Sequence, residues 1–406
     1  MVIQRFRPDF GGQGVQLEQL CQALSRRGIR SVILCATRER PSEWELHDGY
    51  RVRRLRADVL PGSHTRNRLW MPTFGLRVFV ELLRLDDVAV VHVHGFHDGF
   101  LGARAFCRLR HVPLVYEMTL MGDDDPLSVL SARSLAARLR RTALRRSDAY
   151  VAMSNAFLPS YEAAALPSDR LRVIPQGVDT RRFQPLTGDP RRQARADAGC
   201  GEGDPMIVFV GSLIARKGID VLLAAWPRVH ARRPDAKLVL VGRDDFPAAS
   251  ADSRFLDAHL ALMPAGTRQS VRCLGLRNDP ERFLGAADAF AFPSRREGFG
   301  SVIIEAMSSG LPCVVAEMPG ITDFVFSAPS RAGSADSEPT DGVVVGQDDP
   351  NALASALLDC FARPERAAGI GREARRTACD RFDLDAVIAP AYERLYAEMA
   401  ERGPRA

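Results

Sequence analysis

Short apolar runs recur along most of the chain, and stretches with helical spacing of apolar residues lie between them. Runs rich in Val, Leu, Ile and Ala predict strands that are buried on both faces of a parallel sheet. The predicted strands are 32–35, 88–93, 114–116, 149–152, 207–210, 238–241, 289–292 and 312–316. The predicted helices include 16–27, 132–146, 221–231, 303–309 and 351–362. This alternation predicts an α/β fold with helices on both faces of a parallel sheet.

The strand–helix pattern occurs twice, which predicts two doubly wound domains. A chain of 406 residues is also too long for one ordinary core. Residues 171–205 separate the two halves and contain several prolines and a polar stretch, as an interdomain linker does. We therefore predict domains over 1–185 and 186–383. The segment 327–340 is rich in Ser, Ala, Pro and Gly without periodicity, which predicts a mobile surface insertion.

The composition is that of an ordinary soluble globular protein, with 46% hydrophobic and 26% charged residues. We find neither an apolar run long enough to span a bilayer nor a secretory leader pattern, so we expect a cytoplasmic protein. The eight cysteines are scattered without a Cys-x-x-Cys pair, which favours reduced thiols. The net charge of +5 comes without a basic stripe interleaved with aromatics, so we expect no nucleic-acid partner.

The stretch Arg-Glu-Gly-Phe-Gly-Ser-Val-Ile-Ile-Glu-Ala at 296–306 carries the most specific chemistry. Its carboxylates, Glu297 and Glu305, flank a glycine turn that leads into an apolar helix, and both can point to one side of that helix. One carboxylate would hold sugar hydroxyls and the other a ribose diol. Backbone N–H groups at the helix start can hold phosphate or sugar oxygens. The residues assigned to this turn are Gly298, Phe299, Gly300 and Ser301. The motif predicts a nucleotide-sugar site.

Positive charge follows the predicted strand that ends near Val210, at Arg216 and Lys217. Departure of a nucleoside diphosphate requires fixed positive charge where the bond breaks, and this turn can supply it. Taken alone, the pair would be read as a solvated basic turn. In the N-terminal half, Gly11 and Gly12 follow the first strand and open a helix, so this loop is expected to approach the diphosphate. An isolated glycine pair is usually only a turn.

Three histidines, His92, His94 and His97, cluster at the end of an apolar strand. Strand carboxyl ends line the ligand crevice of an open α/β sheet, so we expect these histidines to face the acceptor, with a structural role for at least one as the alternative. A metal site is disfavoured because no complementary acidic ligand with clear geometry is evident. The run Asp123-Asp124-Asp125 precedes Pro126 and predicts a helix cap rather than a metal motif. We therefore expect no cofactor and no essential metal.

Lipid contact is one interpretation of two further segments. Residues 127–146 predict a basic amphipathic helix, which fits either a solvated helix face or anionic lipid. Residues 60–83 carry large apolar side chains that fit either a core cover or a lipid acceptor. Peripheral membrane contact at the inner face of the plasma membrane is therefore kept as an interpretation.

At this point an ordered set of motifs resembles a known family, the retaining GT-B glycosyltransferases of family 4, over nearly the whole chain. The matching motifs are Phe10-Gly11-Gly12, Ile174-Pro175-Gln176-Gly177-Val178-Asp179, Gly211-Ser212 through Lys217-Gly218, Ala286-Ala287-Asp288, Pro293-Ser294, Glu297 through Glu305, Gly310-Leu311-Pro312 and Pro319-Gly320. The resemblance implies two Rossmann-like domains facing a cleft, with the donor bound mainly by the C-terminal one. It also implies a final helix, about 384–399, that returns onto the N-terminal domain.

The resemblance also implies roles for individual residues. Lys217 corresponds to the lysine that contacts the diphosphate. The family usually has an arginine where this chain has Ser212, so Arg216 is expected to supply part of the charge. Many relatives carry a histidine after the strand at 114–116, where this chain has Glu117 and Thr119 instead. We assign the acceptor side to His94, His97, Glu117 and Thr119.

Together these features predict a retaining glycosyltransferase that moves a sugar from a nucleotide-sugar donor to a saccharide, lipid-linked or small-molecule acceptor. The resemblance implies front-face transfer, in which the departing phosphate helps to deprotonate the acceptor hydroxyl. We assign Arg216, Lys217 and Glu297 to catalysis. Two alternatives remain: a nucleotide-sugar epimerase of the same fold, and a non-catalytic nucleotide-sugar-binding protein.

Overall fold

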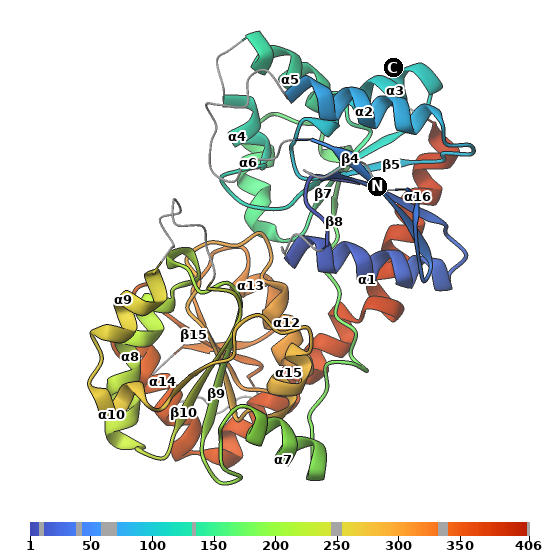
Figure 1. Cartoon of the computed structure of the whole chain (residues 1–406). Coiled ribbons are helices and arrows are strands. Elements are labelled where there is room, and N and C mark those ends of the chain that lie inside the picture. Colours follow the sequence, from blue (N-terminus) through green and yellow to red (C-terminus); the bar gives the residue numbers. More distant parts are fainter. Residues whose placement is uncertain are drawn as a thin grey trace. The chain divides into compact units, whose positions relative to one another are not determined.

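The computed structural model describes residues 1–7, 12–37, 43–57, 71–131, 135–244, 254–331 and 340–403. The chain forms two compact α/β units, each with helices on both faces of a sheet (Figure 1). Unit 1 comprises Met1–Gly177 and Leu384–Ala406, and unit 2 comprises Val178–Asp383. Unit 1 is therefore discontinuous in sequence, whereas unit 2 is one continuous segment.

The sheet of unit 1 has the strand order β3-β4-β2-β1-β5-β6-β7-β8 among the described residues. Its strands are β1 Val2–Ile3, β2 Ser31–Thr37, β3 Glu45–His47, β4 Tyr50–Arg56, β5 Val91–His94, β6 Leu114–Met118, β7 Ala149–Ala152 and β8 Leu171–Val173. Every neighbouring pair is parallel except β3 with β4. The helices are α1 Gly12–Arg26, α2 Met71–Leu83, α3 Gly99–Arg110, α4 Pro126–Ser131, α5 Leu135–Arg145, α6 Leu158–Ala163 and α16 Ala389–Arg402.

The sheet of unit 2 has the order β11-β10-β9-β12-β13-β15-β14, and all of its pairs are parallel. Its strands are β9 Met206–Val210, β10 Lys237–Val241, β11 Val271–Cys273, β12 Ala289–Phe292, β13 Cys313–Ala316, β14 Pro329–Arg331 and β15 Gly342–Val345. The helices are α7 Gly188–Asp197, α8 Ile219–Arg232, α9 Phe255–Ala261, α10 Ala265–Arg268, α11 Pro280–Ala286, α12 Ser301–Ser308, α13 Thr322–Val325, α14 Pro350–Ala362 and α15 Pro364–Phe382.

The last part of the chain completes unit 1. It opens with a π-helical turn, Leu384–Ile388, and continues as α16. Apolar side chains of this segment, including Leu395 and Met399, share a buried cluster with Leu20 and Leu24 of α1. Figure 1 shows α1 and α16 beside each other. The returning segment is thus part of the hydrophobic core of unit 1, and it is helical from Leu384, where the resemblance placed its start.

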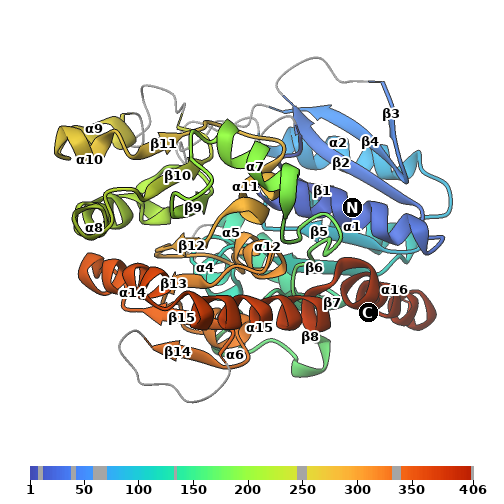
Figure 2. The same cartoon turned by 90° about the horizontal axis from the view of Figure 1, so that it is seen from below.

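Several segments differ from the sequence-based expectation. Residues 171–205 are not one linker, because they contain β8 and α7. Of the helix expected over 127–146, the described residues form α4 and α5, and 132–134 lie outside them. Residues 329–331 of the expected insertion form β14 at the edge of the unit 2 sheet (Figure 2), while 332–339 lie outside the described residues. Short or edge strands were missed because hydrogen bonding to a neighbour, rather than a long apolar run, defines them.

The segment that leaves unit 1 joins unit 2 earlier than the domain boundary placed at 185/186. The Val178 N–H donates to the Phe382 carbonyl at 2.9 Å, and the Ser308 hydroxyl donates to the Phe183 carbonyl at 2.6 Å. The Leu186 N–H donates to the Gly285 carbonyl at 2.8 Å. These bonds fix residues 178–186 against unit 2.

Candidate functional site

A tight turn places Lys217 beyond the carboxyl end of β9, a central strand of unit 2. The 3₁₀ turn Ala215–Lys217 ends at Gly218, whose backbone has φ +70°. A Cβ at Gly218 would lie 1.9 Å from the Pro293 carbonyl oxygen, so the turn and the segment after β12 approach as closely as only glycine permits. The Arg295 N–H also donates to the Arg216 carbonyl at 2.9 Å. The basic turn is therefore held against the segment that leads to Glu297.

Lys217 and Glu297 form a buried ion pair, with Nζ 2.5 Å from Oε1. The Ser294 hydroxyl donates to the same oxygen at 2.6 Å, and Arg216 Nη1 lies 3.4 Å from it. Burial alone would raise the pKa of Glu297, but the charges of Lys217 and Arg216 outweigh it and lower that pKa. Burial lowers the pKa of Lys217, and Glu297 opposes the shift. The carboxylate is thus ionised and already oriented by two cations and a hydroxyl.

The ion pair brings together two predicted site residues that are 80 positions apart in the sequence. The catalytic roles assigned to Lys217 and Glu297 stay predictions. Arg216 is turned partly to the backbone, because its Nη1 also donates to the Arg296 carbonyl at 2.7 Å. Ser294 was not selected from the sequence as a site residue. Its signal was available in the Pro293-Ser294 motif, but only the fold shows that its hydroxyl orients Glu297.

The glycine turn leads directly into α12, as the sequence predicted for a helix start. Gly300 caps the helix with φ +81°, and Ser301 is its first residue. The Phe299 ring is buried and packs edge-on against Phe324 and Phe382. A contact of Phe299 with a ligand would therefore come from its backbone. Together with Gly298, this turn presents backbone groups at a helix N-terminus, where the helix dipole favours anions.

Glu305 lies in the second turn of α12, and the described residues offer its side chain no hydrogen bond or ion pair. Burial raises the pKa of Glu305 to about 7, while the charge of Arg182 opposes the shift and that of Glu281 adds to it. Arg182 is engaged elsewhere, since its Nη2 donates to Glu281 Oε2 at 2.8 Å. Glu305 therefore has unused acceptor capacity, which suits a ligand that brings its own hydroxyl donors.

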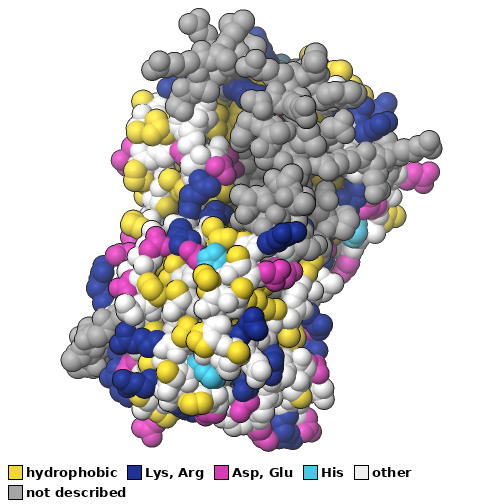
Figure 3. Space-filling model, turned by 60° about the vertical axis from the view of Figure 1, so that its left-hand side comes forward, with side chains coloured by type: hydrophobic (Ala, Val, Ile, Leu, Met, Phe, Trp, Pro, Cys, Tyr) yellow, Lys and Arg dark blue, Asp and Glu magenta, His cyan; other side chains and the backbone are white. Residues whose placement is uncertain are grey.

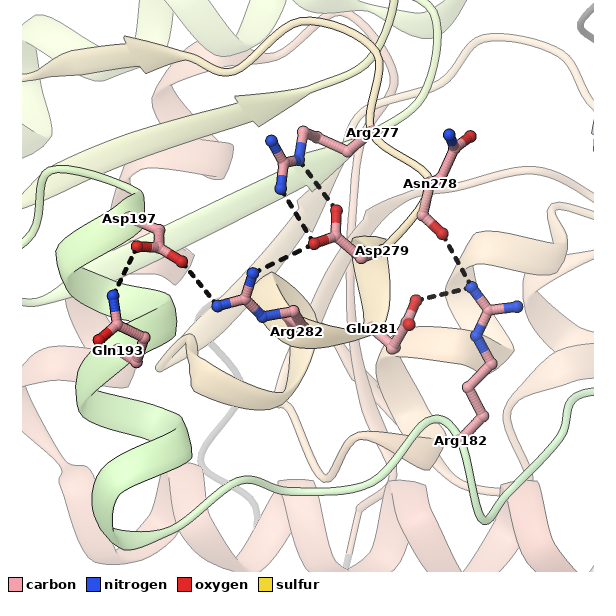
Figure 4. Close-up of polar contacts among 8 residues, drawn as sticks. All are labelled: Arg182, Gln193, Asp197, Arg277, Asn278, Asp279, Glu281 and Arg282. Atoms are coloured by element: carbon pink, nitrogen blue, oxygen red, sulfur yellow. Dashed lines mark hydrogen bonds and ion pairs between the residues drawn. The ribbon is translucent and has the colours of Figure 1, made fainter.

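Arg182 and Glu281, whose charges act on Glu305, belong to a polar network that was not anticipated from the sequence. Figure 4 shows this network. Arg182 Nη2 donates to the Asn278 carbonyl at 3.1 Å as well as to Glu281. Arg282 bridges Asp279, at 3.2 Å, and Asp197 of α7, at 2.6 Å. These contacts tie the loop after β11 to α7 and to the first residues of unit 2. Charged residues that are dispersed in sequence give no local signal for such a network.

In unit 1, β5 and β6 bring two histidines onto one carboxylate. His94 is the register partner of Glu117, and its Nδ1 lies 3.2 Å from Glu117 Oε1. His92 Nε2 lies 3.3 Å from Oε2 of the same side chain. Burial alone would raise the pKa of Glu117, but His94 and His92 reverse the shift and hold it well below its usual range. The acidic partner that the sequence did not reveal is therefore Glu117.

The C-terminal helix completes this cluster. The Tyr392 hydroxyl donates to Glu117 Oε2 at 2.7 Å, and the Tyr396 hydroxyl lies 2.8 Å from His92 Nδ1. A cavity of about 20 Å³ adjoins the cluster and is large enough for about one water molecule. Its polar lining includes His94, Glu117, Tyr392, Gln13 and Gln16. The sequence gave no reason to connect residues near 395 with those near 92.

His97 and Thr119 are anchored within unit 1 rather than in this cluster. The Gly99 N–H donates to His97 Nδ1 at 3.1 Å, and the buried ring packs against Phe74. Burial lowers the pKa of His97 to about 4. The Thr119 N–H and hydroxyl both donate to the buried carboxylate of Asp124, the former at 2.8 Å. Asp124 was missed as a positioning residue because it lies within an acidic run.

The remaining sequence assignments fall as follows. Asp125 caps α4, as predicted, because its carboxylate accepts from the Ser128 N–H at 3.2 Å. Gly12 opens α1, while Gly11 lies outside the described residues. The eight cysteines are free thiols.

Among the described residues, no helix is long and apolar enough to cross a membrane. On the face in Figure 3, coloured basic and acidic side chains are interspersed rather than gathered by sign.

The fold and the site together define the class of protein. It is an α/β protein whose second unit carries a basic turn, a buried glutamate and a glycine-capped helix. Comparison with known families then identifies it. Residues 10–182 match the model described as Glycosyltransferase Family 4, and residues 204–363 match the model described as Glycosyl transferases group 1. The chain belongs to this glycosyltransferase family and is a transferase that uses a nucleotide-sugar donor.

Curated relatives agree with this assignment. The chain is 28% identical over 405 residues to a D-inositol 3-phosphate glycosyltransferase of Jonesia denitrificans, covering 95% of this chain and 92% of the relative. It is 32% identical over 258 residues to a GDP-mannose-dependent alpha-(1-6)-phosphatidylinositol monomannoside mannosyltransferase of Mycolicibacterium smegmatis, covering 60% and 61% of the two chains.

Solved structures show the same fold. Sucrose-phosphate synthase from Thermosynechococcus elongatus superposes with a TM-score of 0.75 at 23% identity, covering 99% of both chains. Anabaena HepE in complex with UDP-glucose gives a TM-score of 0.72 at 18% identity, covering 98% of this chain and 99% of that one. The chain therefore has the GT-B fold.

Proposed function

We propose that this protein is a retaining glycosyltransferase that moves a sugar from a nucleoside-diphosphate sugar to an acceptor hydroxyl. The observation that carries the proposal is the buried Lys217–Glu297 pair, 2.5 Å apart, beside a glycine-capped helix start. A cation next to an ionised carboxylate provides both of the groups needed, one for the diphosphate and one for sugar hydroxyls. The family assignment supports the use of a nucleotide-sugar donor.

On the donor side, Lys217 and Arg216 stabilise the negative charge that develops on the leaving diphosphate. Glu297 accepts hydrogen bonds from hydroxyls of the donor sugar, and its orientation by Ser294 makes that recognition selective, because a missing partner leaves a buried carboxylate unsatisfied. Backbone groups of Gly298, Phe299, Gly300 and Ser301 contact the sugar or distal phosphate. Glu305 accepts from the ribose hydroxyls.

In the reaction, the bond between the anomeric carbon and the phosphate oxygen breaks as the acceptor oxygen bonds to the same face of that carbon. The acceptor proton passes to the departing phosphate. The protein then contributes position and charge, and no covalent glycosyl-enzyme intermediate and no essential metal is required. On the acceptor side, His94, His97, Glu117 and Thr119 of unit 1 position the hydroxyl that attacks.

A saccharide or a lipid-linked saccharide is the acceptor class we favour over a small natural product. The mannosyltransferase named above acts on phosphatidylinositol monomannoside, which is a lipid-linked saccharide. Peripheral contact with the inner face of the plasma membrane would suit a lipid-linked acceptor. Exposed apolar residues on α2 support such contact, namely Leu76 at 62% exposure, with Val80 and Leu83 at 37% each. Their spacing places them along one side of the helix.

The first experiment is thermal unfolding of the purified protein with UDP-, GDP-, ADP- and dTDP-sugars. A ligand that binds the folded state raises the unfolding temperature by mass action. We expect one nucleotide to raise it selectively and the Glu305→Ala variant to lose the shift. If no donor shifts the unfolding of well-folded protein, the proposed donor site is wrong.

The second experiment separates transfer from the alternatives. The selected donor is incubated with a panel of saccharide acceptors, and the anomeric configuration of the product is read by NMR. We expect a glycoside that keeps the donor's configuration. Inversion would refute the retaining mechanism. Conversion of the donor to an epimer without an acceptor would favour an epimerase, and unchanged donor throughout would favour a binding protein.

A further inference from the structure

The His92–His94–Glu117 cluster of unit 1 has the composition of a metal site. One ring nitrogen of each histidine and one carboxylate oxygen lie within 4.8 Å of one another, and all three residues are buried. The two histidines alternate along β5 with one residue between them, and Glu117 comes from the neighbouring strand β6. Two neutral imidazoles and one carboxylate form a common ligand set for zinc and related ions.

The distances in the cluster fit a shared ion better than simple hydrogen bonds. Charge-assisted N–H···O bonds are about 2.7–2.9 Å long, whereas the two histidine–carboxylate distances are 3.3 and 3.2 Å. His92 Nε2 is also buried and has no hydrogen-bond partner, despite its nearness to Glu117. The two distances run to different oxygens of the carboxylate, Oε2 for His92 and Oε1 for His94. Each is close to the separation of about 3.3–3.4 Å between two ligands that lie about 2.0–2.1 Å from a tetrahedral zinc.

Two tyrosines of α16 form hydrogen bonds with the proposed metal ligands and so hold them in orientation. Metal-bound histidines usually engage the other ring nitrogen in a hydrogen bond, which fixes ring orientation. For His92 that partner is the Tyr396 hydroxyl, 2.8 Å from Nδ1. Tyr392 donates to Glu117 and so orients the carboxylate. The adjoining cavity of about 20 Å³ has room for one water as a fourth ligand.

We propose that His92, His94 and Glu117 bind one divalent first-row transition ion, with zinc as the reference ion, and that this ion fastens α16 to the sheet of unit 1. The site shares no residue with the proposed donor side, which comprises the Gly11-Gly12 loop of unit 1 and the residues of unit 2. It shares His94 and Glu117 with the proposed acceptor side, but the evidence for it is the geometry of the cluster and not the proposed glycosyl transfer. The ion would fix His94 and Glu117 in position at the carboxyl ends of β5 and β6.

The test uses the full-length protein, first freed of metal with EDTA and then titrated with zinc sulfate. We expect about one zinc per chain by elemental analysis after removal of free metal. At a hundredfold excess over the dissociation constant, the unfolding temperature should rise by roughly 5–10 °C. Cobalt(II) in the same protein should give the visible absorption of a tetrahedral site with nitrogen and oxygen ligands.

Variants locate the ion. His92→Gln and Glu117→Gln should each lose stoichiometric zinc and the zinc-dependent shift, whereas His47→Gln, outside the cluster, should keep both. Tyr396→Phe removes only the supporting hydroxyl and should weaken zinc binding about 10–100-fold while the protein stays folded, so it decides the matter if the ligand variants unfold.

Several results would overturn the proposal. One is well-folded wild-type protein that neither retains metal nor shifts with zinc, cobalt, manganese or iron(II), which would leave a cluster of hydrogen bonds only. Another is zinc retained in full by folded His92→Gln and Glu117→Gln proteins. A cobalt spectrum with intense thiolate charge-transfer bands would place the ion on cysteine instead. Donor-induced shifts, measured in parallel, report on unit 2 and distinguish failure of this site from failure of the proposed function.

Discussion

At the residue scale, the central feature is the buried Glu297 carboxylate, which its neighbours keep ionised and hold in one orientation. Glu297 is buried, yet Lys217, Arg216 and Ser294 all converge on Oε1. Burying a single charge would be strongly unfavourable, and pairing it with cations removes most of that cost. The result is an ionised, immobile acceptor next to a cation, which is the arrangement expected where a charged leaving group departs.

Removing the cation tests this arrangement directly. We expect Lys217→Ala to lower kcat for sugar transfer by about 10²–10³-fold, because the charge on the leaving diphosphate would lose the cation that is proposed to stabilise it. The fold should survive, since Arg216 remains 3.4 Å from the Glu297 carboxylate. The matched control is Lys237→Ala, which changes the only other lysine of the chain and should retain activity. Undiminished transfer by folded Lys217→Ala protein would remove Lys217 from the mechanism.

The proposed role of Glu305 predicts that donor binding depends on pH. Its pKa of about 7 in the folded protein lies above the ordinary 4.5, so folding favours the protonated form and its stabilising contribution is lost as pH rises from about 4.5 through 7. In the proposed function, in contrast, the ionised carboxylate holds the ribose hydroxyls. We therefore expect the affinity for the nucleotide-sugar to rise between pH 6 and pH 8, as measured by calorimetry. Glu305→Gln should bind more weakly and show a flat profile, and an equally steep profile in that variant would contradict the assignment.

At the element scale, the site depends on short connections that leave the carboxyl ends of parallel strands. Gly218 ends the turn that carries Lys217, and Gly300 begins the helix that carries Glu305. Both have positive φ, at +70° and +81°, so local backbone geometry demands glycine at each. The strands and helices have regular geometry. Gly218 and Gly300 set the direction in which the chain enters and leaves them at the site.

Two glycine substitutions separate backbone strain from steric clash. Gly188 and Gly218 both have positive φ, but a Cβ at Gly188 meets open space, whereas one at Gly218 would lie 1.9 Å from the Pro293 carbonyl oxygen. We expect Gly188→Ala to lower the free energy of unfolding by about 1–2 kcal/mol and Gly218→Ala by about 2–5 kcal/mol. Denaturant unfolding would measure both, and equal losses would show that the contact at Gly218 relaxes without cost.

At the scale of the whole molecule, the two units differ in how the chain builds them. Unit 2 is one continuous segment, closed by α15 and by backbone bonds such as that from Val178 to Phe382. Unit 1 needs the end of the chain, because Tyr392, Leu395 and Met399 form part of its buried core. Unit 1 therefore completes its core only after the last residues have joined it.

This difference predicts how fragments behave. We expect residues 178–383 to unfold cooperatively on their own and to keep a donor-induced rise in unfolding temperature. Residues 1–177 should lack cooperative unfolding, because an apolar face that α16 covers would be exposed. Joining 384–406 to that fragment through a flexible linker should restore it. A cooperative transition for 1–177 alone would show that α16 is dispensable to the core. Calorimetry of the three fragments makes the comparison.

The sequence by itself determined the features that a short stretch can encode. Buried apolar runs specified the central strands, and β7 and β12 begin and end where the pattern placed them. The glycine turn and the start of α12 were also predicted, because a helix start depends on adjacent residues. The motif at 296–306 indicated its chemistry for the same reason, since its carboxylates and glycines are close in sequence.

Only the tertiary structure decided which distant groups meet. Lys217 reaches Glu297 because β9 and β12 are neighbours in the sheet, and the histidines of β5 gain Glu117 because β6 lies beside β5. Tyr392 and Tyr396 join that cluster only because α16 packs onto unit 1. Strand order is set by the packing of the whole unit rather than by any local pattern. A single sequence therefore predicts the elements but not the contacts across them.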